Sequence, residues 1–297
     1  MLILKLKRFI INIARNNCEV YSDAEVSHMI KDYDACSFAA KNVRIKSNFH
    51  SHNYLCGHAV GTVSDYVKEA VACGLETIGI SDHCNCPYGG YYNMPAGMES
   101  DYLSQFDAAR AKYGDRIRIL SAVEIEYFDD QAEFYENLLS KLDYLVLGQH
   151  RFYYDGAIRD SFCDGTNEDI VVAYFNSIER GVKSGFFAMV AHPDLIFYQH
   201  QPVTPAIADA FDSFVKVAAE CGVPIELNAN GIRNHRFIYP TDLLISLCQK
   251  YDAPVVVSSD CHAPNELCDS YMRDLYAFAL DKKLNVVNEL RLRSRDR

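Results

Sequence analysis

Nine side chains of types that commonly bind metal ions stand in or just after short apolar segments of this 297-residue chain. They are seven of its ten histidines, one glutamate and one aspartate: His50, His52, His58, His83, Glu124, His150, His192, Asp260 and His262. Imidazole and carboxylate groups together suit divalent Zn, Mn or Fe, and a carboxylate such as Glu124 can bridge two ions. Nine donors exceed the need of one or two ions, so the sequence favours a centre of three divalent cations.

Each of these motifs has an ordinary structural explanation when it is taken alone. The two histidines of "HSH" (50–52) lie on one face if the segment is a strand, because strand side chains alternate. "SDH" (81–83) and "HPD" (192–194) could be turns or helix caps, and a single histidine such as His150 is usually a hydrogen-bonded polar residue. Their joint placement at several apolar segments favours the metal centre. The other three histidines do not stand at such segments and are interpreted as ordinary polar residues: His28, His200 and His235.

The segments that must position these donors alternate between strand and helix signals. Seven runs rich in Val, Ile and Leu predict strands at 43–50, 77–83, 117–125, 143–150, 186–192, 224–230 and 254–260. Stretches of helical period follow them near 62–73, 99–113, 130–141, 166–184, 204–220, 240–251 and 265–282. Four helix ends carry a glycine, as a left-handed C-terminal cap prefers: Gly74, Gly114, Gly185 and Gly222. Near-continuous apolar strands separated by helices are typical of a parallel sheet covered by helices.

Seven strand–helix units predict a (β/α)7 barrel of the TIM type rather than an open sheet. An open nucleotide-binding sheet would normally carry a glycine-rich phosphate loop after its first strand, and neither G-x-G-x-x-G nor G-x-x-x-x-G-K-[ST] occurs. In such barrels the chemistry lies at the carboxyl ends of several strands. The predicted donors stand at these ends, so a barrel brings them together at one mouth.

The composition fits one large domain with a segment at each end. Hydrophobic residues make up 49% of the chain and charged residues 23%, which is enough to build a full core. We expect a helical N-terminal extension at 1–43, a barrel at 44–285 and a basic C-terminal tail at 286–297. Charges at Lys5, Lys7 and Arg8 interrupt the first apolar run, which disfavours a signal peptide. No other run is long enough to cross a membrane.

Charge and cysteine content limit the partners and the location. The formal net charge is −11, and an acidic body repels nucleic acid unless cations are bound in it. Eleven cysteines without a repeated C-x-x-C pair favour reduced thiols and a cytoplasmic location over a disulfide framework. Four of them flank the predicted donors and are interpreted as small apolar fillers: Cys56, Cys84, Cys86 and Cys261. Nothing in the composition indicates an oligomeric state.

The motifs "FHSH" (49–52), "SDH" (81–83), "AVEIEYF" (122–128), "AHPD" (191–194) and "SSDCH" (258–262) resemble the polymerase and histidinol phosphatase (PHP) family in order and spacing. The resemblance covers about residues 44–282 and includes all nine donors. It implies a distorted seven-stranded barrel with a trinuclear metal centre. The ions would be held by three sets: His50, His52, Glu124 and Asp260; Glu124, His150 and His192; and His58, His83 and His262.

"CGHA" (56–59) and "IELNANGIR" (225–233) resemble the histidinol-phosphate phosphatase branch of this family. That branch implies hydrolysis of a small phosphate monoester, histidinol phosphate above all, in histidine biosynthesis, with metal-bound hydroxide as the nucleophile. It implies that Arg233 binds the substrate phosphate and stabilises its charge in catalysis; the alternative is a surface arginine. Three polar residues are interpreted as partners that orient ligand imidazoles, the first of them a candidate catalytic residue: Asp82, Asp194 and Asn228.

One departure from the branch leaves the substrate open. No Lys or Arg occurs between "HPD" (192–194) and Lys216, where that branch often has basic residues. Arg151 and Arg159 are candidates to supply the missing cation. A phosphodiesterase, exonuclease or nucleotide phosphatase would use the same metals, but a nuclease needs a basic strip for the nucleic-acid backbone. A non-catalytic metal-binding module is the third possibility, although it should lack some donors and none is missing.

Overall fold

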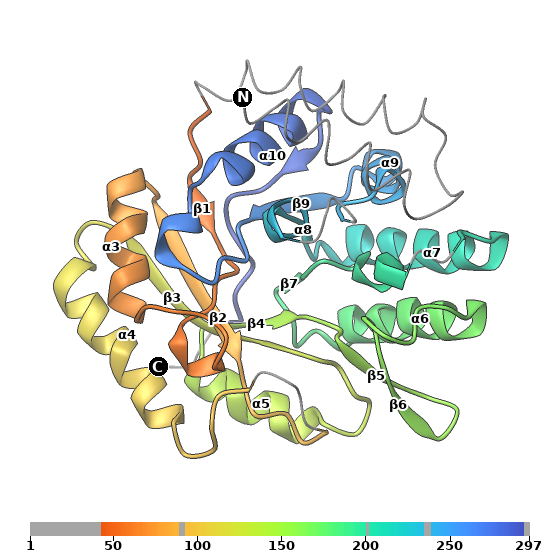
Figure 1. The fold of residues 1–297 in the computed structure, drawn as a ribbon, viewed down its shortest axis with the longest axis horizontal. Coiled ribbons are helices and arrows are strands. Elements are labelled where there is room, and N and C mark those ends of the chain that lie inside the picture. The colour runs from red at the N-terminus through yellow and green to blue at the C-terminus, as the bar shows by residue number, and fades with distance from the viewer. Residues whose placement is uncertain (1–42, 89–92, 200–201, 235–238, 294–297) are drawn as a thin grey trace.

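Eight parallel strands form one strongly curled sheet (Figure 1) in the part of the chain that the computed structural model describes, residues 43–88, 93–199, 202–234 and 239–293. The strands, in their order across the sheet, are β1 (Ser47–Asn48), β2 (Thr77–His83), β3 (Arg118–Ile125), β4 (Tyr144–Leu147), β7 (Met189–Val190), β8 (Ile225–Asn228), β9 (Pro254–Ser258) and β10 (Asn285–Val286). The predicted α/β architecture, a distorted TIM-like barrel, is confirmed. The predicted seven strands are all present, and β10 is an addition.

The seven predicted helices are also present, and they lie outside the sheet (Figure 1). They are α3 (Val63–Cys73), α4 (Glu99–Tyr113), α5 (Ala132–Lys141), α6 (Glu168–Ser184), α7 (Pro205–Cys221), α9 (Asp242–Tyr251) and α10 (Ser270–Asp281). Side-chain caps fix several starts: at α3, for example, the Thr62 hydroxyl accepts from the Asp65 amide while the Asp65 carboxylate accepts from the Thr62 amide. Local sequence signals therefore determine where these helices begin.

The glycine caps follow the prediction at three of four helices. Gly74, Gly185 and Gly222 adopt left-handed backbone angles after α3, α6 and α7. The prediction for Gly114 was wrong, because its φ is −66° and its amide continues the helical pattern by donating to the Arg110 carbonyl. Close approach, not a left-handed backbone, favours glycine here, because a Cβ atom at this position would lie 2.5 Å from the Arg110 carbonyl oxygen.

Strand β3 shows how the sheet separates a helix-facing core from the barrel interior. Ile119, Val123 and Ile125 belong to the large apolar cluster that also contains helix residues. Leu120 and Ala122 belong to a second cluster, together with interior residues of the other strands. Because strand side chains alternate, Glu124 shares the inward face with Leu120 and Ala122. The strand therefore carries a carboxylate into the barrel at its carboxyl end.

The segment that follows β1 and the segment that follows β9 lie side by side at the mouth of the barrel. An isolated parallel bridge joins Ser51 to Cys261. The His52 amide donates to the Cys261 carbonyl at 3.0 Å, and the Asp260 amide donates to the His50 carbonyl at 3.1 Å. At the other end of the barrel, β10 pairs with β9. We call the junction between residues 48–52 and 258–261 the seam.

Five predicted strands end two or three residues earlier than expected, and after two of them, β4 and β8, a side chain replaces the backbone ladder. Strand β4 stops at Leu147, and the side-chain amide of Gln149 then bonds both the backbone amide and the carbonyl of Tyr127, at 3.0 and 3.1 Å. Strand β8 stops at Asn228, whose side chain caps the short helix α8 (Ala229–Arg233). An antiparallel hairpin, β5 (Arg151–Tyr154) and β6 (Ala157–Asp160), follows β4 and was not predicted.

The residues after β10 lie across the amino end of the barrel. Leu290 is buried in the interior cluster, and Val287 and Leu292 pack against it. Arg293 donates to both carboxylate oxygens of Glu136 at 3.0 Å. The predicted basic tail thus contributes apolar side chains to the bottom of the barrel as far as the structure describes it.

Some predictions fall on residues outside the described ranges. They concern the N-terminal extension up to residue 42, the last four residues, and three histidines: His28, His200 and His235. In the ranges that are described, no helix combines the length and apolar character needed to cross a bilayer, and the nine cysteines there are free thiols.

Candidate metal centre

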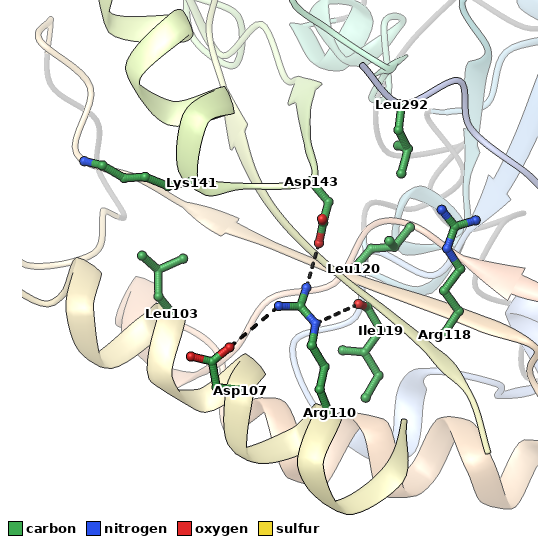
Figure 2. Close-up of a pocket in the computed structure, with 9 residues that line it drawn as sticks. All are labelled: Leu103, Asp107, Arg110, Arg118, Ile119, Leu120, Lys141, Asp143 and Leu292. Atoms are coloured by element: carbon green, nitrogen blue, oxygen red, sulfur yellow. Dashed lines mark hydrogen bonds and ion pairs between the residues drawn. The ribbon is translucent and has the colours of Figure 1, made fainter. Parts of the chain in front are cut away.

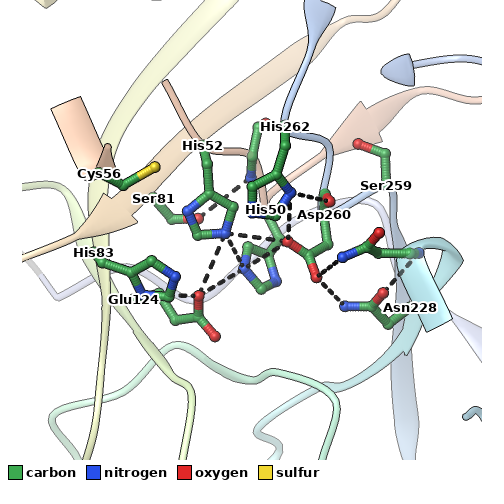
Figure 3. Close-up of polar contacts among 12 residues, drawn as sticks. His50, His52, Cys56, Ser81, His83, Glu124, Asn228, Ser259, Asp260 and His262 are labelled. Carbon is green, nitrogen blue, oxygen red and sulfur yellow. Dashed lines mark hydrogen bonds and ion pairs between the residues drawn. The ribbon is translucent and has the colours of Figure 1, made fainter. Parts of the chain in front are cut away.

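All nine predicted donors gather at the carboxyl ends of the strands, and Figure 3 shows the part of the cluster that lies along the seam. The rings of His52 and His83 are stacked with centroids 4.5 Å apart, and His58 and His262 are also 4.5 Å apart. On the other side, His83 contacts His150 at 5.4 Å, and His150 contacts His192 at 5.1 Å. The structure therefore brings donors from six strands into one continuous cluster.

Glu124 lies at the centre of this cluster, and its two carboxylate oxygens face different histidines. Oε2 is 3.0 Å from His50 Nε2 and 3.4 Å from both His52 Nε2 and His83 Nδ1. Oε1 is 2.9 Å from His192 Nε2 and 3.5 Å from His150 Nε2. A carboxylate between two groups of imidazoles has the arrangement needed to bridge two cations.

Three groups of predicted donors place one ligand atom each within 4.8 Å of one another: His50, Glu124 and His192; His50, His52 and Asp260; His52, His83 and Glu124. The second group contains three of the four residues predicted for the first ion. The first group contains two of the three predicted for the second ion. The grouping around each ion stays a prediction, whereas the convergence of the donors is a property of the structure.

The contacts between imidazoles test whether a cation suits this site. His50 Nε2 lies 3.1 Å from His52 Nε2, and His58 Nε2 lies 2.8 Å from His262 Nε2. Two imidazole nitrogens can approach so closely only when they share a proton or a cation, because two N–H groups repel each other. With carboxylates as the remaining neighbours, the donor set fits divalent metal ions.

Burial and charge set the protonation of the cluster. Burial, reinforced by the charge of His52, lowers the pKa of His262 to about 3, and burial also lowers the pKa of His83 well below its usual value. Burial raises the pKa of the Glu124 and Asp260 carboxyls, but the neighbouring imidazoles, His50 foremost, outweigh it and hold the pKa of both well below normal. Burial lowers the pKa of His50 and His52 as well, but the neighbouring carboxylates outweigh it and hold the pKa of both rings well above normal. Because metal ions bind neutral imidazoles and ionised carboxylates, His50 and His52 would release a proton on binding a cation.

Two of the donors stand on strained backbone. His192 has a φ of 25° and Asp260 a φ of 43°, a region that residues other than glycine rarely adopt. Such strain persists only where the surrounding structure holds it, and it concentrates at functional sites. At both positions the chain leaves its strand and turns a donor toward the mouth.

The residues predicted to orient imidazoles have different partners. Asp82 is buried, with Oδ1 3.5 Å from His52 Nδ1, and its role in orienting that ring stays a prediction. The Asn228 side chain donates to Asp260 Oδ2 at 3.0 Å, so it supports a carboxylate instead. Asp194 accepts from the Thr241 amide at 2.6 Å, and burial raises its pKa to about 6.

The three predicted phosphate-binding arginines are placed very differently. The Arg233 side chain is 7% exposed and donates to Asp269 at 2.6 Å, to the Ser259 carbonyl and to the Glu266 carbonyl. It is therefore neither a surface residue nor a free cation. Arg151 lies 3.4 Å from the Tyr88 carbonyl through one guanidinium nitrogen. Arg159 Nε is buried and has no hydrogen-bond partner among the described residues.

Two residues for which no role was predicted support the donors directly. Glu226 is fully buried and contacts His50 and the backbone of His192. Gly148 leaves room for Glu124, because a Cβ atom at this position would lie 2.1 Å from Glu124 Oε1 and 2.5 Å from its Cγ. A charged residue in the apolar strand "PIELN" was the available signal for Glu226, whereas nothing local to Gly148 pointed to Glu124.

Replacing Gly148 with alanine is expected to displace Glu124 and to lower turnover by about 100-fold, the usual cost of shifting a reacting geometry by about 1 Å. The measurement is turnover together with metal content. Gly156→Ala is the control. Gly156 lies at the tip of the β5–β6 hairpin, and a Cβ atom there would have no other atom within 4 Å, so alanine strains only the positive φ of this residue. Parental turnover of Gly148→Ala would contradict the expectation.

A separate hollow lies near the start of β3, away from the mouth. It has a volume of about 630 Å³ and includes Arg118, the first residue of that strand, and Leu292 of the tail. Figure 2 shows that Arg110 crosses it to reach Asp143, at 2.7 Å, and the Ile119 carbonyl. None of the nine predicted donors lines this hollow.

A curled parallel sheet with helices outside and a buried imidazole and carboxylate cluster at its mouth defines a class of α/β barrels built around divalent metals. The model of the PHP domain family matches residues 48–230 of this chain. The chain belongs to the PHP domain family, as its motifs predicted.

Curated relatives and solved structures agree with this assignment. A probable histidinol-phosphatase of Deinococcus radiodurans is 26% identical over 229 residues, covering 73% of this chain and 86% of that protein. A probable phosphatase of Caldanaerobacter subterraneus is 24% identical over 254 residues, covering 84% and 87%. The histidinol phosphate phosphatase of Lactococcus lactis, solved with zinc, L-histidinol and phosphate, has the same fold at a TM-score of 0.64 and 16% identity, covering 82% of this chain and 95% of that one.

Proposed function

We propose that this protein hydrolyses a small phosphate monoester, with histidinol phosphate as the favoured substrate and divalent metal ions as cofactors. The observation that carries the proposal is the complete set of nine donors at the mouth of a PHP-family barrel. The names of the relatives from Deinococcus radiodurans and Lactococcus lactis support histidinol phosphate as the first substrate to test. A non-catalytic role is disfavoured because none of the donors is missing.

The residues of the chain would hold the cofactor and orient the phosphate. Divalent ions at such a site neutralise phosphate oxygens and make water a nucleophile near neutral pH. Glu124 would be shared between ions, while His50, His52 and Asp260 would bind on the side of the seam. Asp82, beside His52 Nδ1, would keep that ring in the orientation that exposes Nε2. These groups act by position and charge, so no covalent intermediate with the protein is required.

Arg159 is the arginine whose environment best supports phosphate binding. Its Nε is buried and has no hydrogen-bond partner among the described residues, while the side chain as a whole is half-buried. A buried donor without a partner favours a ligand that accepts a hydrogen bond. Arg233 already donates to Asp269 and to two carbonyls, which suits a role in holding the loop that carries Asp260 and His262. We therefore rank Arg159 before Arg151 and Arg233 as the phosphate ligand.

An aromatic wall beside His150 supports a substrate that carries a ring. Phe162 is parallel to His150, with an interplanar angle of 5° and centroids 6.1 Å apart, and Tyr198 meets Phe162 edge to face at 5.6 Å. The Phe162 amide donates to Asp160 Oδ1 at 2.8 Å, and the Ser161 amide donates to the His150 carbonyl at 2.8 Å. This rigid turn holds a partly exposed ring next to the donors. The imidazole of histidinol could stack on it.

Phe162→Ala is expected to lower kcat/KM for histidinol phosphate by about 10-fold, the value of one aromatic contact. Glycerol phosphate, which has no ring, should lose less than about 2-fold in the same variant, because only a stacking contact is removed. Steady-state kinetics on both substrates measures the ratio. An equal loss on both substrates would mean that Phe162 supports the fold or the donors rather than the substrate.

A substrate panel tests the proposed function. Metal-loaded protein is assayed with histidinol phosphate, phenyl phosphate, glycerol phosphate, a nucleoside monophosphate and a short single-stranded oligonucleotide. Highest kcat/KM for histidinol phosphate is the expected result. Cleavage of the oligonucleotide alone would replace the proposal with a nuclease function, which the acidic net charge of −11 disfavours. No turnover of any substrate, with metal bound, would overturn an enzymatic role in phosphate ester hydrolysis.

A further inference from the structure

Strand β8 supplies none of the nine predicted donors, yet it places a fully buried glutamate directly behind them. Glu226 has an exposed fraction of 0%. A carboxylate withdrawn from water in this way is strongly destabilising unless it is paired and hydrogen-bonded. Its partners therefore indicate what the residue does.

The partners of Glu226 come from three segments. Oε1 lies 2.8 Å from His50 Nδ1. Oε2 accepts from the backbone amide of His192 at 2.9 Å and from the Asn228 side chain at 2.8 Å. Two of these three contacts involve predicted donors, one through its ring and one through its backbone.

The contact with His50 determines which ring nitrogen can bind a cation. An ionised carboxylate accepts but cannot donate, so Nδ1 of His50 must carry the proton that faces Glu226. When the ring is neutral, Nε2 keeps its lone pair, and it is the nitrogen that faces Glu124, at 3.0 Å, and His52. A carboxylate behind an imidazole also makes the ring a stronger donor.

The contact with His192 holds strained backbone in place. The φ of His192 is 25°, and the Glu226 carboxylate accepts from the amide of this same residue. The His192 ring lies on the opposite side of Glu124 from the seam, with Nε2 2.9 Å from Glu124 Oε1. Glu226 thus acts on histidines that face the two different oxygens of Glu124.

A further link reaches the seam. Asn228 donates to both Glu226 Oε2 and Asp260 Oδ2, at 2.8 and 3.0 Å (Figure 3 shows the Asp260 contact). Asn230 also donates to Asp260 Oδ2, at 3.2 Å. Strand β8 and the start of α8 therefore support predicted donors on three other segments without contributing one.

We propose that Glu226 is a positioning residue that fixes the tautomer of His50 and the backbone of His192, and that it reaches Asp260 through Asn228. The inference rests on the proposed function in that these donors bind divalent metal ions. It goes beyond that function because it assigns part of the metal affinity to a residue that is not one of the nine predicted donors.

The test compares Glu226→Gln with Asp143→Asn in the full-length protein. Glutamine keeps the size of the side chain but removes the charge and turns one N–H₂ group toward groups that need an acceptor. Asp143 is the matched control, because it is also a poorly exposed carboxylate with several hydrogen-bond donors, and it lies far from the predicted metal ligands. It accepts from the Arg110 guanidinium and from the backbone amide and side-chain hydroxyl of Ser121, at 2.7 to 2.9 Å. Both variants are expected to lose thermal stability.

Metal affinity separates the two variants. Competition with a chelator for Zn²⁺ should show an affinity lower by about 10- to 100-fold in Glu226→Gln and within about 2-fold of the parent in Asp143→Asn. The absorption bands of bound Co²⁺ should shift only in Glu226→Gln, because the geometry around the ion changes. Glu226→Asp, which restores the charge with a shorter side chain, should recover part of the affinity.

Parental Zn²⁺ affinity and an unchanged Co²⁺ spectrum in Glu226→Gln would overturn the proposal. If this variant does not fold, Asn228→Ala tests the link to Asp260, and parental affinity there would also count against the proposal. The affinity measurements do not need a substrate. A wild-type protein that binds Zn²⁺ but hydrolyses no phosphate ester would remove the proposed function and leave the role of Glu226 to be decided by affinity alone.

Discussion

Glu124→Gln is expected to lower both the metal content and the phosphatase turnover. Turnover should fall by more than about 100-fold, which is the upper cost of losing a residue that only supports a metal ligand. Both oxygens of Glu124 face histidines, five in total, at 2.9 to 3.5 Å. An amide replaces one of these oxygens with an N–H₂ group, which cannot bind a cation, and it removes the negative charge between the two groups of imidazoles.

Elemental analysis of the purified variant and turnover of histidinol phosphate check this expectation. Glu136→Gln is the control, because Glu136 forms an exposed ion pair with Arg293 and should leave both quantities unchanged. A Glu124→Gln protein with parental metal content and parental turnover would exclude Glu124 from the site.

Removing the metal ions with a chelator is expected to abolish turnover and to lower Tm by roughly 5–10 °C. Ions that bind only the folded state stabilise it, and withdrawing ions held at about 100 times their Kd costs about 2.7 kcal/mol. Without them, the buried carboxylates of Glu124 and Asp260 are balanced only by protonated imidazoles, among them His50.

Thermal unfolding with and without the chelator measures the effect, and adding back Zn²⁺, Mn²⁺ or Fe²⁺ one at a time shows which ion restores both Tm and turnover. Recovery of both by one ion is the expected outcome. A metal-free protein with parental Tm and parental turnover would refute a role for divalent ions in this fold.

Periodicity and helix-end signals predicted most of the fold. The seven strand and helix units repeat a local pattern that each segment displays by itself, and caps such as Thr62 and Gly74 mark helix ends within one turn. The donors could be found because histidine is rare and because strand ends of a barrel converge. The family motifs predicted the same nine donors independently, and the match to the PHP domain confirms the family.

The features that were missed depend on contacts between segments far apart in sequence. Gln149 ends β4 by bonding Tyr127 with its side chain, which no periodicity reveals. The ion pair of Arg233 with Asp269, 36 positions later, was likewise not predicted, and the role of Arg233 at the substrate stays a prediction. No role was predicted for Glu226, because its contacts with His50 and His192 join segments that lie far apart in the sequence.

The seam has a consequence for how the protein is made. It joins Asn48 to Ser259, residues separated by 211 positions, and His50 and His52 stand on one side of it with Asp260 on the other. During synthesis from the N-terminus, His50 and His52 leave the ribosome long before Asp260, which completes their group. A growing chain therefore cannot assemble the full set of donors until the segment with Asp260 and His262 has been translated, so the proposed metal loading belongs to a late stage of folding.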